Sequence, residues 1–302
     1  MSISIQNLTK KIDNRTILDN VTISVKVGEI VGFLGPNGAG KTTTLKIIAG
    51  ALDFQEGKVE VCGLNVKNDR LFSSGKIGYL PENNALYEDM YVQEYLLFVA
   101  EIRNVGEEKK RKIQNIIQQV GLRKESKKKI SELSKGCKQR VGIAQSLISD
   151  PEVLILDEPT SGLDPIQMDD IRNLICEIGK DRTVILSSHN MLEVKELCTR
   201  AIIIHEGRIV ADIEDVSDLQ PLDAGLSTIC VEFEKDIDER ILHKTLSTAK
   251  TITKTSARKY NIISSEDIRK QIFELAVHES NALLTLTKNA KSLDDIFRKY
   301  TS

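Results

Sequence analysis

Apolar and polar residues alternate over the first part of the chain. This period of two is typical of half-buried β-strands, so we expect two strands within residues 3–27, joined by a turn near Asp13-Asn14-Arg15. Three further apolar runs are interpreted as short strands. They cover residues 29–34, 57–63 and 76–80, and the last of them ends at Pro81.

The pattern becomes helical after this point. Apolar residues recur at three- and four-residue intervals within 92–105 and again within 107–120, as they do on the buried face of an amphipathic helix. We therefore interpret the region from about 82 to 134 as a helical insert. A further helix is expected over 138–149, where Asp150-Pro151 ends it.

Strand patterns return in the next part of the chain. Apolar runs predict strands over 153–158 and 182–189, and a hairpin over 201–212 that turns at Glu206-Gly207. The first of these strands ends in two carboxylates and the second ends in a histidine. Polar side chains of this kind at strand ends are candidates for chemistry.

A second pattern begins near residue 227, and its order is β-α-β-β-α-β. This order suggests a small ferredoxin-like unit. A last helix is expected over 292–297, where Ser292 and Asp295 resemble a capping box. The six elements before it are predicted over 228–234, 236–247, 251–255, 259–264, 266–277 and 282–287.

Composition adds limits to this picture. The 302 residues are enough for two domains. No apolar run approaches the roughly 20 residues of a membrane-spanning helix, and we expect no secretion signal. The net charge of −2 gives no bulk attraction to nucleic acid, so we expect no nucleic-acid partner. The five scattered cysteines lack C-x-x-C spacing, which predicts reduced thiols without a metal site.

Residues 123–129 form a basic run. Two interpretations stay open for it. A charged run of this length is commonly a solvated surface, and it can also bind anions or lipid headgroups.

One glycine-rich stretch carries the clearest chemistry. It matches the P-loop pattern G-x-x-x-x-G-K-[ST] between a predicted strand and a helix expected over 43–50. The glycines let backbone N–H groups approach phosphates, the lysine adds a cation, and the first threonine offers a hydroxyl to Mg²⁺. These residues are Gly35, Pro36, Asn37, Gly38, Ala39, Gly40, Lys41, Thr42 and Thr43.

Asp157, Glu158 and His189 follow two of the predicted strands. In open α/β sheets, ligands bind beyond the carboxyl ends of the strands, so these side chains should meet the P-loop. Asp157 would bind Mg²⁺, and Glu158 would accept a proton from attacking water. Taken alone, the acids could instead begin a helix, and the histidine could be an ordinary surface residue.

The order of further motifs resembles one family. With the P-loop they are similar to the signature, Walker B motif, D-loop and switch histidine of ABC ATPases. A finer likeness, over residues 77–92, is to the gliding-motility-associated ATP-binding subunits of exporter-type systems. The motifs are Leu133-Ser134-Lys135-Gly136 with Gln139-Arg140, then Leu156-Asp157-Glu158-Pro159-Thr160-Ser161-Gly162-Leu163-Asp164-Pro165, then Ser188-His189.

The resemblance implies an α/β fold, with a P-loop NTPase cassette over residues 1–218. Such a cassette has a mixed sheet core, an antiparallel β subdomain and a helical subdomain. Residues 226–302 would form a small α+β accessory domain with a role in dimer stabilisation or regulation. The chain would be an ATPase subunit, with ATP and Mg²⁺ as its cofactors.

The resemblance also implies roles for residues. Two copies would sandwich ATP, and Ser134 and Gly136 of one copy would contact the γ-phosphate held by the other. Glu82 stands where the family usually has a glutamine near Mg²⁺. The catalytic residues would be Glu158, His189 and Lys41. The homodimer would act on separate transmembrane permease subunits, and so be cytoplasmic and peripheral at the inner face of the cell membrane.

The sequence departs from the family pattern in four places. Ile12 stands where an aromatic residue usually stacks on adenine, which leaves ATP against GTP preference open. Glu82 adds a negative charge beside the phosphates. In the signature, Lys135 replaces a glycine and Cys137 replaces a glutamine.

Alternatives to a transporter subunit are a soluble ABC-type ATPase and a nucleotide-sensing regulatory module. DNA-repair types need a long coiled coil before the signature, and translation types carry two cassettes in one chain; neither fits this sequence. The candidates for contact with a membrane subunit are Leu86, Tyr87, Met90 and Tyr91, which suit a buried turn equally well. The transported substrate is not readable from this chain.

Overall fold

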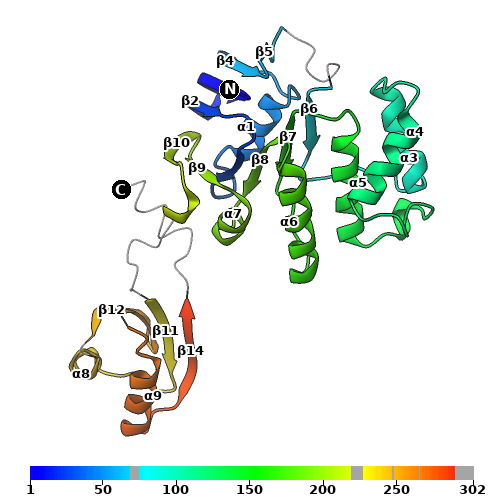
Figure 1. Ribbon diagram of the computed structural model, residues 1–302. Coiled ribbons are helices and arrows are strands. Elements are labelled where there is room, and N and C mark those ends of the chain that lie inside the picture. Colours follow the sequence, from blue (N-terminus) through cyan, green and yellow to red (C-terminus); the bar gives the residue numbers. More distant parts are fainter. Residues whose placement is uncertain (69–74, 219–226, 247, 265, 290–302) are drawn as a thin grey trace. The chain divides into compact units, whose positions relative to one another are not determined.

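The computed structural model describes residues 1–68, 75–218, 227–246, 248–264 and 266–289. The chain divides into two compact units, Met1–Asp218 and Leu219–Ser302 (Figure 1). Each unit has a hydrophobic core of its own. The first unit contains a mixed sheet, an antiparallel sheet and the helices around them, which is the expected α/β class.

The antiparallel sheet of the first unit has the strand order β2-β1-β4-β5. The predicted turn of its first hairpin is confirmed: Asp13 and Asn14 both have positive φ, 46° and 62°, as tight hairpin turns require. The strands are β1 (Ile3–Ile12), β2 (Arg15–Val25), β4 (Glu56–Val61) and β5 (Leu64–Asn65).

The mixed sheet has the order β10-β9-β3-β8-β7-β6. Its strands pair in parallel except for β10, which is antiparallel to β9. Strands β7 and β8 are buried along their whole length, because parallel sheets are covered on both faces. The strands are β3 (Ile30–Leu34), β6 (Ile77–Leu80), β7 (Val153–Asp157), β8 (Thr183–Ser188), β9 (Arg200–His205) and β10 (Arg208–Ile213).

The helical insert is confirmed between β6 and β7. Figure 1 shows its first two helices lying together beside α5. Its elements are α3 (Val92–Ile102), α4 (Lys109–Gln119), η1 (Ile130–Glu132) and α5 (Lys135–Leu147). Helix α5 begins three residues earlier than predicted, because Ser134 caps it by accepting a hydrogen bond from the Cys137 N–H.

Three other helices and a 3-10 turn belong to the described residues of the first unit. Helix α1 follows the P-loop, as predicted. Helices α6 and α7 were not predicted, although α6 has a clear start signal: Asp164 accepts a hydrogen bond from the Gln167 N–H, and Pro165 follows it. The elements are α1 (Lys41–Ile48), α6 (Pro165–Gly179), α7 (Met191–Leu197) and η2 (Val216–Asp218).

The second unit has the predicted β-α-β-β-α-β order. The four strands among its described residues form one antiparallel sheet with the order β12-β13-β11-β14, which is the ferredoxin-like arrangement. The core includes Phe233 and Tyr260, whose rings meet edge to face. The helix predicted over 292–297 lies outside the described residues. The elements are β11 (Ser227–Phe233), α8 (Glu239–Thr245), β12 (Ala249–Ser256), β13 (Lys259–Ser264), α9 (Arg269–His278) and β14 (Leu283–Asn289).

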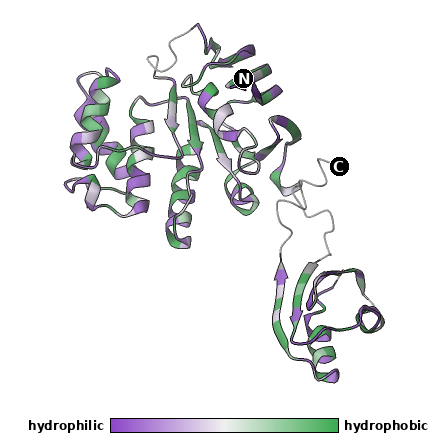
Figure 2. Ribbon diagram, turned by 180° about the vertical axis from the view of Figure 1, so that it is seen from behind, coloured by the Kyte–Doolittle hydropathy of each residue, from purple (hydrophilic) through white to green (hydrophobic). Residues whose placement is uncertain are grey.

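Hydrophobic residues concentrate on the strands of the mixed sheet, whereas the surrounding helices carry both hydrophobic and hydrophilic segments (Figure 2). This distribution is that of amphipathic helices packed on a buried sheet. Among the described residues, no helix combines the length and the apolar character needed to cross a bilayer.

Candidate nucleotide-binding site

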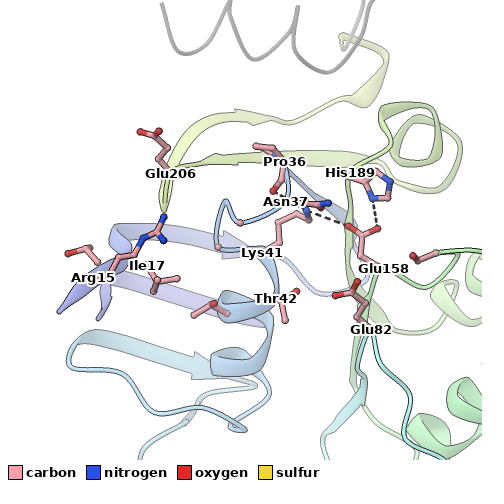
Figure 3. Close-up of a pocket in the computed structure, with 15 residues that line it drawn as sticks. Arg15, Ile17, Pro36, Asn37, Lys41, Thr42, Glu82, Glu158, His189 and Glu206 are labelled. Carbon is pink, nitrogen blue, oxygen red and sulfur yellow. Dashed lines mark hydrogen bonds and ion pairs between the residues drawn. The ribbon is translucent and has the colours of Figure 1, made fainter. Parts of the chain in front are cut away.

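A pocket of about 770 Å³ opens where the P-loop and the ends of the mixed-sheet strands meet (Figure 3). Its volume lies within the range that small-molecule ligands occupy. The lining brings together residues predicted from four separate motifs. It consists of Arg15, Thr16, Ile17, Pro36, Asn37, Gly38, Gly40, Lys41, Thr42, Thr43, Glu82, Glu158, Ser161, His189 and Glu206.

Backbone conformation or close packing requires glycine at three positions of the P-loop. Gly38 and Gly40 have φ values of 81° and 108°, which side chains other than hydrogen rarely tolerate. A Cβ on Gly35 would lie 2.5 Å from the Ile204 carbonyl oxygen. Gly35 and Ala39 are not part of the pocket lining in the described structure; they shape the loop from behind.

Lys41 is buried and points along the P-loop. Its ammonium donates hydrogen bonds to the Gly35 carbonyl at 2.7 Å and to the Pro36 carbonyl at 3.3 Å. It also lies 3.4 Å from a carboxylate oxygen of Glu158, whose side chain is 8% exposed. The P-loop cation and the candidate base therefore form an ion pair in this structure.

Glu158 lies directly after β7 with a φ of 48°. Its backbone N–H donates to the Ser187 hydroxyl at 2.8 Å. Its second carboxylate oxygen lies 2.8 Å from Nδ1 of His189. Glu158 is thus contacted by Ser187 in β8, by His189 just after β8 and by Lys41 of the P-loop. Its backbone conformation is uncommon for a residue with a side chain. Such strain is frequent at functional sites.

Asp157 is fully buried beneath the pocket. Its Oδ1 accepts hydrogen bonds from the Thr42 hydroxyl at 3.2 Å and from the Ser187 hydroxyl at 2.6 Å. Its Oδ2 is a buried acceptor without a hydrogen-bond partner among the described residues. A hydroxyl and an unused carboxylate oxygen beside a phosphate loop fit Mg²⁺, which typically takes one or two carboxylates plus substrate phosphates.

Together with burial, the charge of Asp157 contributes to a raised pKa at a neighbouring tyrosine, Tyr79. Burial, and then the charges of Asp157 and Glu82, raise the pKa of Tyr79 above its usual value. The hydroxyl of Tyr79 is buried and has no hydrogen-bond partner within the described part of the chain. Tyr79 therefore stays neutral at physiological pH beside two acids.

Glu193, on α7, is a buried carboxylate that the sequence analysis missed. It is 2% exposed and accepts hydrogen bonds from the Ser188 hydroxyl at 2.5 Å and from the Thr160 hydroxyl. Thr160 lies two residues after Glu158, and Ser188 directly precedes His189. Glu193 therefore joins the two loops that carry these residues. Its position five residues after Ser188, in the first turn of a helix, is the only signal in the sequence.

The signature residues lie at the start of α5. The Ser134 hydroxyl accepts the Cys137 N–H at 3.3 Å, and its own proton can donate to another group. Gly136 is buried against the side chain of Gln167. Neither Ser134 nor Gly136 belongs to the described lining of the pocket. Lys135 lines a smaller cavity of about 370 Å³ with residues that include Glu82 and Glu158.

The position expected to carry adenine stacking is not at the pocket. Ile12, at the end of β1, is 43% exposed and is absent from the lining that the described residues form. Arg15, Ile17 and Glu206 line that end instead, and the sequence analysis assigned them no role. The two-residue turn at Asp13-Asn14 separates Ile12 from β2, so only the hairpin geometry reveals which strand faces the pocket.

Comparisons with known proteins agree with this site. A family model described as ABC transporter matches residues 18–161. The chain is 34% identical to the bacitracin transport ATP-binding protein BcrA of Bacillus licheniformis, over 97% of this chain and 95% of the relative. It is 33% identical to the uncharacterised ABC transporter ATP-binding protein YhcH of Bacillus subtilis, over 99% and 95% respectively.

Solved structures match about seven tenths of the chain. The ATP-binding subunit of an ABC transporter is similar with a TM-score of 0.64 and 28% identity, over 72% of this chain and 92% of that one. A dimeric ATP-binding cassette, solved in a post-hydrolysis state with ADP and Pi, gives a TM-score of 0.64 and 26% identity, over 71% and 98%.

The phosphate loop, the acids and the histidine thus converge in one pocket, and the relatives extend over nearly the whole chain. Subunits of this family bind and hydrolyse ATP, form dimers and work with membrane permease components. The chain therefore belongs to the ABC transporter family, as one of its ATP-hydrolysing, ATP-binding subunits.

Proposed function

We propose that this chain drives export through separate membrane subunits, as a homodimer that binds ATP between its two copies. The observation that carries the transport proposal is similarity over both units to a bacitracin transport ATP-binding protein. The outward direction is supported by a second relative. A Nod factor export ATP-binding protein of Burkholderia orbicola is 34% identical over 70% of this chain. The finer likeness to gliding-motility subunits stays a prediction.

In this proposal the P-loop binds the phosphates of ATP. Its backbone N–H groups and the start of α1 supply donors, and Lys41 supplies a cation. The Lys41 ammonium now lies 3.4 Å from Glu158, so the γ-phosphate would take over this cation. Glu158 is then left without its counter-ion and can accept a proton from the attacking water.

Thr42, Asp157 and Glu82 are the residues that would hold Mg²⁺ with the phosphates. When bound, the ion neutralises the negative charge that develops on the transferred phosphoryl group. The partnerless Oδ2 of Asp157 supports this assignment. The described residues contain no cluster of three or more His, Cys, Asp or Glu side chains that could hold a metal without the nucleotide.

His189 would hold the base in position. Its Nδ1 lies 2.8 Å from Glu158, so a proton on Nδ1 would donate to the carboxylate and orient it. In the partner copy, Ser134 and Gly136 would contact the same phosphate. They lie at the N-terminus of a helix, where backbone N–H groups lack intrahelical acceptors.

Contact with the membrane subunits would use a groove on the helical insert. The groove is lined by residues on and near α3, including Met90, Tyr91 and Phe98. Tyr87 is 60% exposed, and its ring meets that of Phe98 edge to face at 5.7 Å. Exposed aromatic side chains are typical of interfaces. This contact would hold the subunit at the inner face of the cell membrane.

The experiment that tests the dimer is light scattering on the purified Glu158→Gln variant, with and without Mg-ATP. Removing the base should block hydrolysis and trap the closed pair. We expect a doubling of the mass that depends on ATP. Glu152→Gln is the matched control, because Glu152 is exposed and pairs with Lys76 instead of the pocket residues.

A Glu158→Gln protein that binds Mg-ATP and stays monomeric would contradict closure by this chain alone. A doubled mass without ATP would show that contacts other than the nucleotide hold the pair together. Equal ATP hydrolysis by the Glu158→Gln variant and the wild type would exclude Glu158 as the base.

A further inference from the structure

The pocket has two chemically different ends. Figure 3 shows Glu82, Glu158 and His189 at one side, Lys41 and Thr42 in the middle, and Arg15, Ile17 and Glu206 at the other side. The residues in the middle and at the first side are those proposed to bind the phosphates and to catalyse hydrolysis. The remaining side is where the base of a bound nucleotide must lie.

The backbone fixes this second end. The turn of the β9–β10 hairpin donates the Gly207 N–H to the Ala39 carbonyl at 2.9 Å, and its carbonyl accepts the Asp19 N–H at 2.9 Å. Gly207 also packs on the backbone of Ile17, where a Cβ would lie 2.3 Å from the carbonyl oxygen. Glu206 and Ile17 are therefore held at a set distance from the P-loop.

The guanidinium of Arg15 is available to bind a ligand at this end of the pocket. Within the described part of the chain it takes part in no ion pair or hydrogen bond through its side chain, whereas Arg208, on the adjacent hairpin, pairs with Asp19. Arg15 is the first residue of β2 and directly follows the two-residue turn. An unpaired cation at the mouth of a pocket is a candidate for ligand binding.

We propose that Arg15 replaces an aromatic platform: its guanidinium stacks on the purine base of the bound nucleotide. The proposal rests on the nucleotide site proposed above. The guanidinium is planar and stacks well on aromatic faces. Ile17 supplies apolar contact beside the stack, and the Glu206 carboxylate accepts a hydrogen bond from an amino group of the base.

This arrangement has a consequence for the choice of nucleotide. A guanidinium stacks on any base, since every base has a π face. Glu206 offers acceptors only, and adenine and guanine both carry an amino group that can donate. We therefore expect Arg15 to contribute about equally to the binding of ATP and of GTP.

The test compares the affinities of the full chain for ATP, GTP and inorganic tripolyphosphate by calorimetry, with Mg²⁺ present. Arg15→Ala should lower the affinities for ATP and for GTP about tenfold each. It should leave the affinity for tripolyphosphate within about twofold of the wild-type value. Arg15→Trp should restore ATP affinity to near the wild-type value, because indole stacks without a charge. Lys11→Ala is the control, since it removes an exposed cation from the same hairpin outside the lining.

Two results would overturn the proposal. If Arg15→Ala lowered the affinities for ATP and for tripolyphosphate equally, the guanidinium would interact with the charge of the phosphates and not with the base. Equal ATP affinities of Arg15→Ala and Lys11→Ala would mean that Arg15 makes no contact with the base. Failure of the underlying site is distinguishable, because Lys41→Ala would then bind ATP and tripolyphosphate as the wild type does.

Discussion

Glu158 is the residue at which the separate parts of the site meet. Its carboxylate contacts Lys41 from the P-loop and His189 from the end of β8, and its backbone is held with positive φ. A side chain between a cation and an imidazole responds to a change at either one. We therefore expect a triphosphate that binds Lys41 to change the electrostatic surroundings of Glu158 directly.

Glu193 provides a test at the scale of one residue. We expect Glu193→Ala to lower the free energy of unfolding by about 2 kcal/mol, because two buried hydroxyls, of Thr160 and Ser188, lose their acceptor. ATP turnover should fall about tenfold, since the loops of Glu158 and His189 lose their shared support. Urea unfolding and steady-state hydrolysis measure the two effects.

Glu196→Ala is the matched control for Glu193, because Glu196 lies on the same helix and pairs at the surface with Arg172. Its effect on stability should be within about 0.5 kcal/mol. ATP affinity should change little in both variants, since neither side chain lines the pocket that the described residues form. A large loss of ATP affinity in Glu193→Ala would contradict the supporting role.

Two tyrosines predict a loss of stability in alkali: Tyr79, whose hydroxyl is buried, and Tyr95, whose whole side chain is buried. Burial raises the pKa of Tyr79, and burial together with Tyr87 raises the pKa of Tyr95 to about 12. Above pH ~10 the unfolded chain loses these protons while the folded chain keeps them. The stabilisation is therefore complete below pH ~10 and falls as the pH rises toward the folded-state pKa values.

Urea midpoints measured between pH 8 and about 11 check this pH dependence. Tyr79→Phe and Tyr95→Phe should each flatten the decline, whereas Tyr91→Phe, which changes a side chain that is 48% exposed, should not. Tyr79→Phe should also be neutral or stabilising at pH 7, because it removes a buried hydroxyl without a described partner. Unchanged slopes in all three variants would refute the assignment.

At the scale of elements, local patterns predicted most of the fold. The period-two runs predicted the first hairpin, and the helical period predicted α3 and α4. Helices α6 and α7 were not predicted, although the Asp164 cap and Pro165 mark the start of α6. Ile12 and Arg15 show a second limit of prediction from sequence. The geometry of the hairpin turn decides which strand end lines the pocket, and the hydropathy pattern does not encode this geometry. Glu193 became visible only through its buried tertiary contacts.

The groove on the helical insert gives a prediction at this scale. Phe98→Glu should reduce the share of the protein that sediments with cell membranes, because a charge replaces an exposed aromatic side chain beside Tyr87. Fractionation of cells that produce the chain at native level, followed by immunoblotting, measures this share. The control is Phe273→Glu, which alters an exposed phenylalanine of the second unit.

ATP affinity of the purified Phe98→Glu protein should equal that of the wild type, since the groove and the nucleotide pocket have different described linings. Equal membrane fractions for wild type and Phe98→Glu would remove the groove as the docking site. A larger loss with Phe273→Glu would assign docking to the second unit.

At the scale of the whole molecule, the two units have separate cores, and the described lining of the pocket belongs to the first. We therefore propose that residues 1–218 are the ATP-binding domain and that residues 226–302 are an accessory domain. The relatives BcrA and YhcH align over both units, so they share the second unit. We propose that it serves in dimer stabilisation or regulation.

Removal of residues 219–302 tests this division. The truncated chain should bind ATP with unchanged affinity, because every described lining residue remains. Its ATP-dependent dimer, measured by light scattering in the Glu158→Gln background, should be weaker if the second unit stabilises the pair. Dimerisation and activity that match the full chain would exclude that role, and lost ATP affinity would contradict the independence of the first unit.

The short turn of the β9–β10 hairpin has a consequence for how such a chain can vary over evolution. Main-chain hydrogen bonds of Gly207 join this turn to Ala39 and to Asp19, so the span between the phosphate end and the base end of the pocket depends on backbone alone. Side chains along the lining can be exchanged and alter affinity while the span stays the same. An insertion of one residue in this turn would change the span itself, so selection should conserve the length of the turn more strictly than the identity of Glu206.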